Sequence, residues 1–249
     1  MEFAQKLLSN LFPSRCLFCQ KTVNTLTVSG SSGNKNIDVC ADCYKFLPHN
    51  SNCCLRCALP LAEDINNKVL CGRCLQKLPA FDYGYSLFRY EDDVIGLVHQ
   101  LKFAEKISYA RSIGEMLLTK IEREVLPEQG RPDCLLPVPL HRSRLRQRGF
   151  NQSMEISRII AKKLEIPIDY DAVVRQRITV SQTGLNAQQR RKNIKDAFCV
   201  VVDNNYKHVL IIDDVVTTGS TVNELARILK KSKVERVGVL SIARAPVKG

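Results

Sequence analysis

The residues best suited to chemistry lie between His208 and Thr221, where two adjacent carboxylates precede a turn rich in hydroxyl groups. Residues 209–212 form an apolar, mostly β-branched run, which predicts a buried parallel strand. Residues 221–231 carry apolar side chains at helical spacing, so a strand-to-helix turn lies between the two segments. Unpaired N–H groups and the helix dipole favour a phosphate at such a turn. Asp213 and Asp214, at the carboxyl end of the strand, are suited to accept hydrogen bonds from vicinal hydroxyls.

A phosphate together with a diol is the chemistry of a ribose 5-phosphate group. The residues expected to surround the phosphate are Val216, Thr217, Thr218, Gly219, Ser220 and Thr221. The alternative is that the acidic pair simply ends a strand and that the turn residues only cap the helix. The ligand site is favoured because strand, acids, hydroxyls and amphipathic helix follow one another in register. The glycine patterns of P-loops and of dinucleotide-binding turns do not occur in the chain.

A second phosphate-binding candidate is an arginine cluster after residues 135–140, which form a short predicted strand with prolines near its end. Its members are Arg142, Arg144, Arg146 and Arg148, in a segment expected to be a loop before a helix at residues 154–164. Arginine forks bind phosphate oxygens in pairs, so the loop is suited to a pyrophosphate; a solvated basic loop is the alternative. Lys102, near the end of a helix predicted at residues 92–103, is a further candidate, with an ordinary surface lysine as the alternative.

Eight of the eleven cysteines form four Cys-x-x-Cys pairs in the first 80 residues, which predicts two zinc sites with four thiolate ligands each. Sequential pairing groups Cys16, Cys19, Cys40 and Cys43 at one metal, and Cys54, Cys57, Cys71 and Cys74 at the other. Cross-braced pairing stays open, as does Cys53 in place of Cys54. Disulfides are the alternative, but residues 1–12 do not resemble a secretory signal, and a reducing cytosol favours metal.

The charge pattern points to a phosphate-bearing partner. The net charge is +12, of which +8 falls beyond residue 80, and arginines crowd around the predicted phosphate site. Such a surface attracts single-stranded DNA through counterion release. Phe150 and Phe198, beside the basic segments, are candidates for base stacking, with core positions as the alternative. The absence of tryptophan argues against a dedicated base-stacking platform. No apolar run of about twenty residues is present, so a bilayer span is not expected, while peripheral contact with an acidic membrane stays open.

Residues 209–221 resemble the phosphoribosyl pyrophosphate (PRPP) motif of type I phosphoribosyltransferases. The resemblance implies an α/β domain over residues 80–249, with a mainly parallel sheet and flanking helices, after a zinc-binding domain over residues 1–79. By the same resemblance, Asp213 and Asp214 hold the ribose hydroxyls, the turn wraps the 5-phosphate, and the arginine segment matches the pyrophosphate loop. Residues 175–198 match the loop that closes over bound PRPP, with a long surface connection as the alternative. Residues 199–202, which follow it, are predicted to form another strand.

The motifs in this order resemble the ComF family, whose members include ComFC and GntX. The quoted segments are the zinc pairs, residues 99–103, residues 148–152 and residues 213–221. The resemblance covers nearly the whole chain and implies a role in DNA uptake for natural transformation, at the cytoplasmic side of the membrane. It implies PRPP with Mg²⁺, single-stranded DNA, and DNA-uptake or recombination proteins as partners.

Two hypotheses follow. The first is a competence-type protein that binds PRPP and handles single-stranded DNA. The second is an enzyme that transfers the 5-phosphoribosyl group of PRPP to a base or an amine, by positioning and charge stabilisation without a protein nucleophile. Little sequence follows the predicted strand near residue 240 to form an acceptor-specificity segment, which favours the first hypothesis.

Overall fold

The computed structural model describes residues 14–22, 26–30, 33–62, 69–101, 107–176, 194, 196–201 and 205–246. The strands in these ranges are β1 (Leu26–Gly30), β2 (Gly33–Ile37), β3 (Tyr83–Arg89), β4 (Cys134–Pro137), β5 (Val173–Arg175), β6 (Phe198–Val200), β7 (His208–Val216) and β8 (Arg236–Arg244). The helices are α2 (Ala41–Phe46), α3 (Gly72–Gln76), α4 (Asp92–Gln100), α5 (Ile107–Lys120), the π-helical turn η2 (Ile121–Val125), α6 (Leu126–Gln129), α7 (Arg142–Arg148), α8 (Gln152–Leu164) and α10 (Ser220–Lys231).

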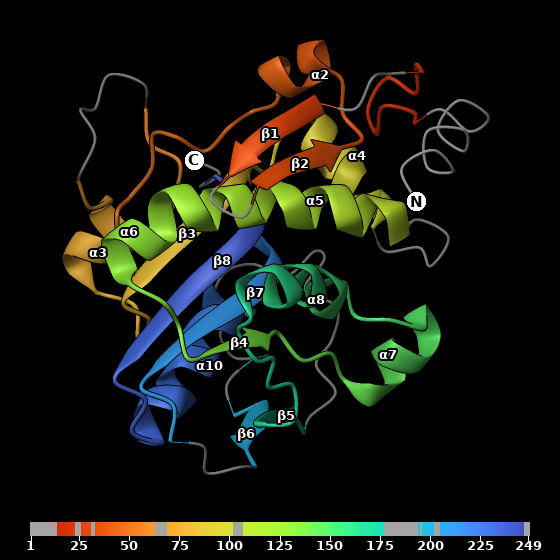
Figure 1. Ribbon diagram of the computed structural model, residues 1–249. Helices are drawn as coiled ribbons and strands as arrows, with labels where there is room; N and C mark the ends of the chain where they lie inside the picture. The colour runs from red at the N-terminus through yellow and green to blue at the C-terminus, as the bar shows by residue number, and fades with distance from the viewer. Residues whose placement is uncertain are drawn as a thin grey trace.

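A four-stranded parallel sheet with the order β3-β8-β7-β4 forms the centre of the molecule (Figure 1). This confirms the predicted α/β architecture. Strand β7 extends beyond the apolar run at residues 209–212, because pairing with β8 continues through Asp213, opposite Ser241, to Val216, opposite Arg244. The acidic pair therefore lies within the carboxyl end of the strand, where ligands of open α/β sheets bind.

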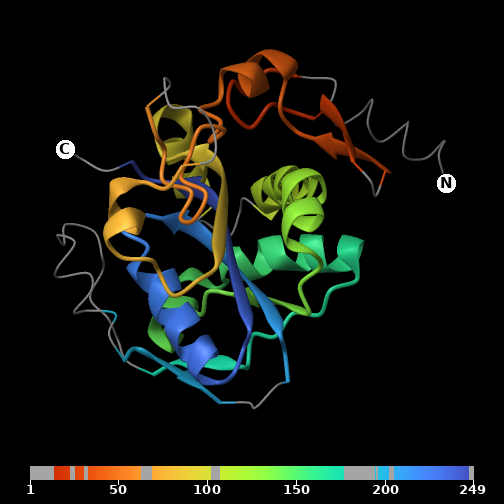
Figure 2. The ribbon, with the colours of Figure 1, turned by 90° about the vertical axis from the view of Figure 1, so that its left-hand side faces the viewer.

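Both faces of the sheet are covered, and the alternation of side chains along β7 shows why its sequence is continuously apolar. Leu210 and Ile212 join the buried cluster that includes residues of α5 and α8. Val209 and Ile211 join the cluster on the opposite face, which includes residues of α10. Figure 2 shows α10 separated from α5 and α8 by the sheet. A strand buried on both sides carries no polar face, which is the pattern that predicted it.

The N-terminal third shares its core with the α/β part. The antiparallel hairpin β1–β2 lies over α5 (Figure 1). Ile37, Val39 and Leu47 belong to the same buried cluster as Phe88 of β3 and Leu117 of α5. A segment of this size cannot bury a large core alone, and here it completes its core against the sheet and helices that follow it.

Two segments differ from the sequence-based expectation. The segment that was expected to be an arginine-rich loop contains helix α7, so that prediction is wrong. The ring nitrogen Nδ1 of His141 accepts a hydrogen bond from the N–H of Ser143 at 3.1 Å, and Gly149, with a φ of 77°, ends the helix. Arginine favours helix once both ends are capped. The strand expected at residues 199–202 exists as β6 but pairs antiparallel with β5, outside the central sheet.

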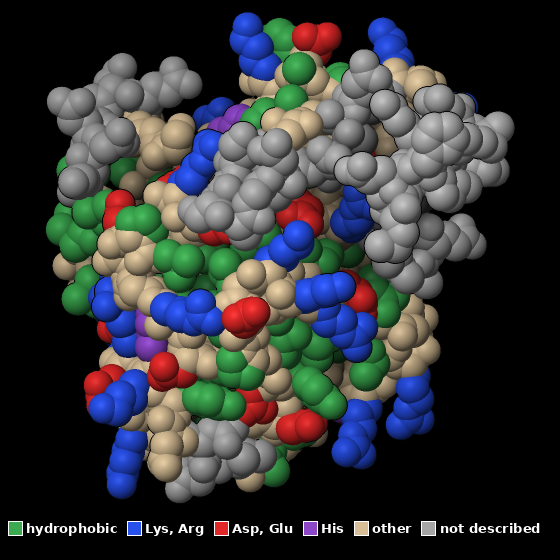
Figure 3. All heavy atoms as spheres, viewed as in Figure 1, with side chains coloured by type: hydrophobic (Ala, Val, Ile, Leu, Met, Phe, Trp, Pro, Cys, Tyr) green, Lys and Arg blue, Asp and Glu red, His purple; other side chains and the backbone are tan. Residues whose placement is uncertain are grey.

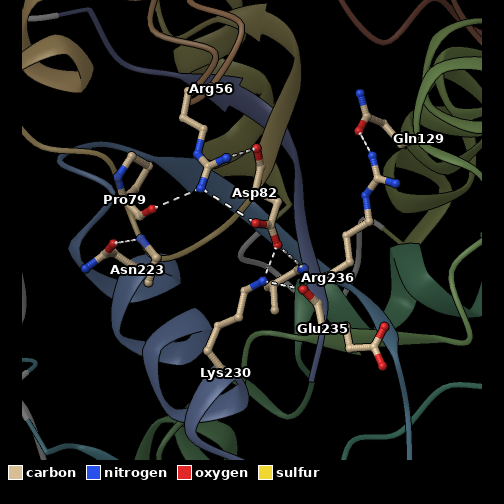
Figure 4. Close-up of polar contacts among 10 residues, drawn as sticks. Arg56, Pro79, Asp82, Gln129, Asn223, Lys230, Glu235 and Arg236 are labelled. Atoms are coloured by element: carbon tan, nitrogen blue, oxygen red, sulfur yellow. Dashed lines mark hydrogen bonds and ion pairs between the residues drawn. The ribbon is translucent and has the colours of Figure 1, made fainter. Parts of the chain in front are cut away.

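A polar network fastens the zinc-binding part to the sheet and to α10 (Figure 4). Arg56 donates from Nη1 to the carbonyl of Asp82 at 2.6 Å and from Nη2 to the carbonyl of Pro79 at 3.3 Å. The Asp82 carboxylate in turn accepts from Lys230 Nζ at 2.6 Å and from the N–H of Val237 at 2.7 Å. Two cations and one carboxylate thus join the segments around residues 56, 82 and 230–237.

The tight contact between Gly238 of β8 and Tyr83 of β3 generates a stability prediction. A Cβ atom at residue 238 would lie 2.2 Å from Tyr83 Cζ, and the Tyr83 hydroxyl is hydrogen-bonded to His208 Nε2 at 2.7 Å. Gly238→Ala should therefore displace the ring and lower the free energy of unfolding in urea by roughly 1–3 kcal/mol. Gly96→Ala, on an exposed helix with open space around the new Cβ, is the control and should not destabilise the protein. Equal stability of the Gly238→Ala variant and the wild type would contradict this contact.

Candidate functional site

The carboxyl edge of β7 carries an acidic pair that is largely withdrawn from solvent. Asp213 is 9% exposed and Asp214 is half-buried. The N–H of Asp214 donates to Asp213 Oδ1 at 2.9 Å, and the N–H of Val215 donates to Asp214 Oδ1 at 2.7 Å. Burial, and then the neighbouring charge of Asp214, raise the pKa of Asp213 well above its usual range. Such a pair gains most from a ligand that brings hydroxyl donors or a cation.

The turn after β7 leads directly into α10, as the sequence predicted. Gly219 has a φ of 77° and is the N-cap residue of α10, and no side-chain hydrogen bond caps this helix. Thr218 Oγ1 lies 2.8 Å from Ser220 Oγ and accepts the N–H of Ser220 at 3.3 Å. Residues 217–221 are half-buried, so hydroxyl and N–H groups gather at the start of this helix. This arrangement suits a phosphate.

Helix α7 separates the four arginines of the cluster into two pairs at i,i+4 spacing. Arg144 and Arg148 are half-buried, whereas Arg142 and Arg146 are exposed. Burial, followed by the charge of Arg148, lowers the pKa of Arg144. The sequence showed four equivalent charges, and only the helix distinguishes an inner pair from an outer pair.

Arg175, at the end of β5, is a candidate that the sequence reasoning did not single out. It is 7% exposed, and its guanidinium lies over the Phe198 ring at 5.4 Å from the centroid. Burial and then the charge of Arg144 lower its pKa to about 10, while Asp213 acts in the opposite direction. Arg144, Arg175 and Asp213 therefore share one electrostatic neighbourhood. The signal in the sequence is faint: a charged residue closing a three-residue strand.

Two sequence-based candidates lie outside the described residues. These are Lys102 and most of the predicted closing loop, residues 177–193. Phe198, which was weighed as a base-stacking side chain, is 5% exposed and belongs to the core beneath Arg175.

The eight paired cysteines form two clusters, and each is built from one tight turn and one short helix. The turn ends in a residue with positive φ, Gln20 at 59° or Ala58 at 54°. The helix begins at a cysteine, Cys40 before α2 or Cys71 before α3. Zinc site 1 comprises Cys16, Cys19, Cys40 and Cys43, and zinc site 2 comprises Cys54, Cys57, Cys71 and Cys74. The grouping is sequential, and Cys53 belongs to neither cluster.

The sulfur positions fit tetrahedral zinc. Within each cluster the ligand atoms all lie within 4.8 Å of one another. The Cys19 and Cys40 sulfurs are 3.9 Å apart, and the Cys57 and Cys71 sulfurs are 3.7 Å apart. Four sulfurs bound to zinc at about 2.3 Å lie about 3.8 Å from one another.

The electrostatics of the cysteines also fit a metal. Burial raises the pKa of Cys54, but hydrogen bonds from backbone N–H groups, beginning with that of Cys71, outweigh it and bring the pKa to about 7. Hydrogen bonds from backbone N–H groups also outweigh burial at Cys16 and bring its pKa to about 7. Burial and the neighbouring thiols raise the pKa of Cys43 and Cys74. Four thiolates can share such a volume only with a cation, and a bound zinc would supply that charge and tie the turn to the helix.

Comparison with known families assigns both parts of the chain. A double zinc ribbon domain matches residues 7–75, and a phosphoribosyl transferase domain matches residues 151–249. The protein is therefore of the class that joins a double zinc ribbon to a phosphoribosyltransferase fold.

Relatives extend the match over nearly the whole chain. Competence protein F of Haemophilus influenzae is 31% identical over 240 residues, which cover 95% of this chain and 99% of that protein. DNA utilization protein YhgH of Escherichia coli K12 is 34% identical over 208 residues, covering 83% and 90%. Competence protein ComFC of Streptococcus pneumoniae is 25% identical over 240 residues, covering 92% and 100%. The chain belongs to the ComF family of competence proteins.

Within the part of the chain that the structure describes, no helix is long and apolar enough to cross a bilayer.

The two clusters generate a prediction about metal content. The purified protein should contain two zinc ions per chain by elemental analysis. Cys54→Ser should reduce this to one, because Cys54 supplies a ligand with a pKa already near neutrality. Cys53→Ser is the matched control and should keep both ions, since the neighbouring thiol lies outside the cluster. Loss of zinc from the Cys53→Ser variant would show that the ligand assignment is wrong.

Proposed function

We propose that the carboxyl edge of the sheet binds PRPP. The observation that carries this proposal is the juxtaposition, on one strand and the turn after it, of a buried acidic pair with a hydroxyl-rich helix start. Asp213 and Asp214 accept hydrogen bonds from the ribose hydroxyls. Residues 216–221 surround the 5-phosphate with hydroxyl and N–H donors. Mg²⁺, which accompanies PRPP, neutralises pyrophosphate charge when bound.

The inner cations complete the proposed ligand site. Arg175 interacts electrostatically with both Asp213 and Arg144, and Arg148 shares the half-buried face of α7 with Arg144. The charges of the arginines repel one another without a ligand, and this repulsion adds to burial, the larger cause, in lowering the pKa of Arg175. A pyrophosphate between them would relieve this repulsion and accept their donors in pairs. We therefore assign the inner pair, with Arg175, to the pyrophosphate.

The outer cations are assigned to single-stranded DNA. Arg142 and Arg146 are exposed on α7, and the whole chain carries a net charge of +12. Figure 1 shows α7 standing away from the sheet, where a long polyanion has access to it. The names of the relatives, a competence protein and a DNA utilization protein, support this assignment. We infer that the protein handles incoming single-stranded DNA during uptake, on the cytoplasmic side of the membrane and together with uptake or recombination proteins.

A catalysed transfer is the second candidate function. The observation that favours it is the buried Arg175, a cation positioned to stabilise a departing pyrophosphate near the acidic pair. The acceptor in that case is a base or an amine. Release of pyrophosphate from PRPP in the presence of such an acceptor would establish the enzyme, and binding without release would establish the non-catalytic function.

The acidic pair can be tested by isosteric substitution. Asp213→Asn with Asp214→Asn should weaken binding of PRPP and Mg²⁺, measured by calorimetry, at least about a hundredfold, because each charged hydrogen bond contributes about 1.5–3 kcal/mol. Burial disfavours the ionised form of Asp213 and raises its pKa in the folded protein. The charge of Asp213 at neutral pH therefore lowers the free energy of unfolding. Asp213→Asn alone should therefore keep or raise the melting temperature. Glu235→Gln, an exposed carboxylate before β8 at the opposite edge of the sheet, should change neither quantity. Unchanged affinity in the double variant would reject the site.

Substitutions on the two faces of α7 should affect the binding of the two ligands differently. Arg142→Gln with Arg146→Gln should reduce the log–log salt slope of single-stranded DNA binding by about 1.4, because each lost phosphate contact contributes about 0.7, and should leave PRPP affinity unchanged. Arg144→Gln with Arg148→Gln should lower PRPP affinity at least about a hundredfold, because two charge-assisted contacts of about 1.5–3 kcal/mol each are lost. The two double variants remove equal charge, so each controls for the other. Identical effects of both on both ligands would contradict the division of the helix.

A further inference from the structure

Arg244 connects zinc site 2 to the turn proposed for the 5-phosphate. It is the last residue of β8 and is 3% exposed. Its Nε donates to the carbonyl of Cys57, a zinc-site-2 cysteine, at 3.1 Å. Its Nη1 donates to the carbonyls of Val216 at 2.8 Å and Ala245 at 3.1 Å, and also to that of Thr217. One guanidinium thus holds the metal-binding turn on one side and the start of the phosphate turn on the other.

The cysteines of zinc site 2 supply the negative charge that balances Arg244. A buried cation normally pairs with a carboxylate, yet no described carboxylate forms an ion pair with Arg244. The negative groups that act on it are Cys57 and Cys71. Four thiolates around one zinc ion leave a net charge of about −2. The loaded zinc site 2 is therefore the counter-ion that a buried arginine requires here.

The metal-binding turn also packs directly against the sheet. A Cβ atom placed on Gly84 of β3 would lie 3.3 Å from the carbonyl oxygen of Arg56 and 3.5 Å from the carbonyl carbon of Cys57. The turn therefore has little freedom to move without moving Arg244 or the strand. Zinc site 1 has different neighbours: beside it, the N–H of Asp38 donates to Ser112 Oγ of α5 at 3.0 Å. The two metal sites are consequently not equivalent with respect to the phosphate turn.

We propose that Arg244 is a positioning residue that couples zinc site 2, and not zinc site 1, to the PRPP site. With zinc bound, Arg244 holds the carbonyls of Val216 and Thr217 so that the following N–H and hydroxyl groups converge on the phosphate. Without zinc, Arg244 loses both its counter-ion and an ordered Cys57 carbonyl, and the turn loosens. Coupling between two sites is reciprocal, so bound PRPP slows the loss of zinc from site 2. This inference rests on the proposed PRPP site.

The structure offers two matched pairs of variants. Cys74→Ser and Cys43→Ser each remove the last ligand of one zinc site, and that ligand lies one turn into the short helix in both. Arg244→Gln and Arg236→Gln each neutralise an arginine of β8, at its carboxyl end and at its start. Hydrogen exchange followed by mass spectrometry of peptides spanning residues 213–221 reports on the turn without any ligand. Calorimetry with PRPP and Mg²⁺ reports on affinity.

Cys74→Ser and Arg244→Gln should speed amide exchange in residues 213–221 and lower PRPP affinity about tenfold, which corresponds to about 1.4 kcal/mol. Cys43→Ser and Arg236→Gln should leave both within about twofold of wild type. An amide exchange rate in Cys74→Ser equal to that of the wild type would overturn the coupling. The same acceleration in Cys43→Ser as in Cys74→Ser would also overturn it, because it would indicate general loosening. Altered exchange in Cys74→Ser, in a protein whose wild type binds no PRPP, would reject the proposed function and keep the coupling.

A measurement on the wild-type protein covers the case in which a variant fails to fold. Zinc release to a chromogenic chelator, after a thiol-blocking mercurial, should show two phases. Saturating PRPP should slow one phase several-fold and leave the other unchanged. Equal rates with and without PRPP, in a protein shown by calorimetry to bind it, would overturn the coupling.

Discussion

The parallel pairing of β7 with β8 is the interaction on which the rest of the structure depends. It carries β7 past its apolar run, so that Asp213 lies opposite Ser241 within the sheet and not on a free loop. It also sets Val216 opposite Arg244, which brings a buried guanidinium to the first carbonyls of the phosphate turn. A shift of this register would move the acids, the turn and the arginine together. The site proposed for PRPP is thus an extension of the central ladder of hydrogen bonds, which fixes the positions of its residues.

Charge is the second organising constraint. The carboxyl edge gathers a buried acid, Asp213, and two withdrawn cations, Arg144 and Arg175, at positions where burial opposes ionisation. Burial in a core by itself disfavours ionisable side chains at such positions. Groups held against their solvation preference concentrate where a ligand is to be bound, because the ligand supplies the missing partners. We propose that this set matches PRPP, with the cations facing its phosphates and the carboxylates facing its ribose hydroxyls.

The zinc ribbons are integral to the α/β fold. Hydrophobic residues within and after zinc site 1 share a core with α5 and β3, and the turn of zinc site 2 lies against β3 and Arg244. Arg56 fastens the same turn to Asp82, which also binds α10 through Lys230 (Figure 4). Figure 3 shows basic side chains spread over the visible face and not confined to one element. We propose that the inner faces of α7 and β5 bind the small ligand and that the exposed basic groups bind the larger polyanion.

The sequence by itself determined the parallel strand, the turn and the helix around Asp213 and Asp214, because hydrophobic period, acid pair and hydroxyl turn are all local in the chain. It also determined four Cys-x-x-Cys pairs, because ligand spacing within a pair is local, whereas the grouping of the pairs and the exclusion of Cys53 were decided by the tertiary structure. It did not determine that α7 is a helix, since capping by His141 and Gly149 outweighed the loop-like run of charges. Only the tertiary structure decided which arginines face inward, that Arg175 lies beside Asp213, and that Arg244 bridges a zinc site to the phosphate turn. Those relations join residues up to 187 positions apart, as between Arg244 and Cys57, and such contacts follow from strand order and burial, which no local pattern encodes.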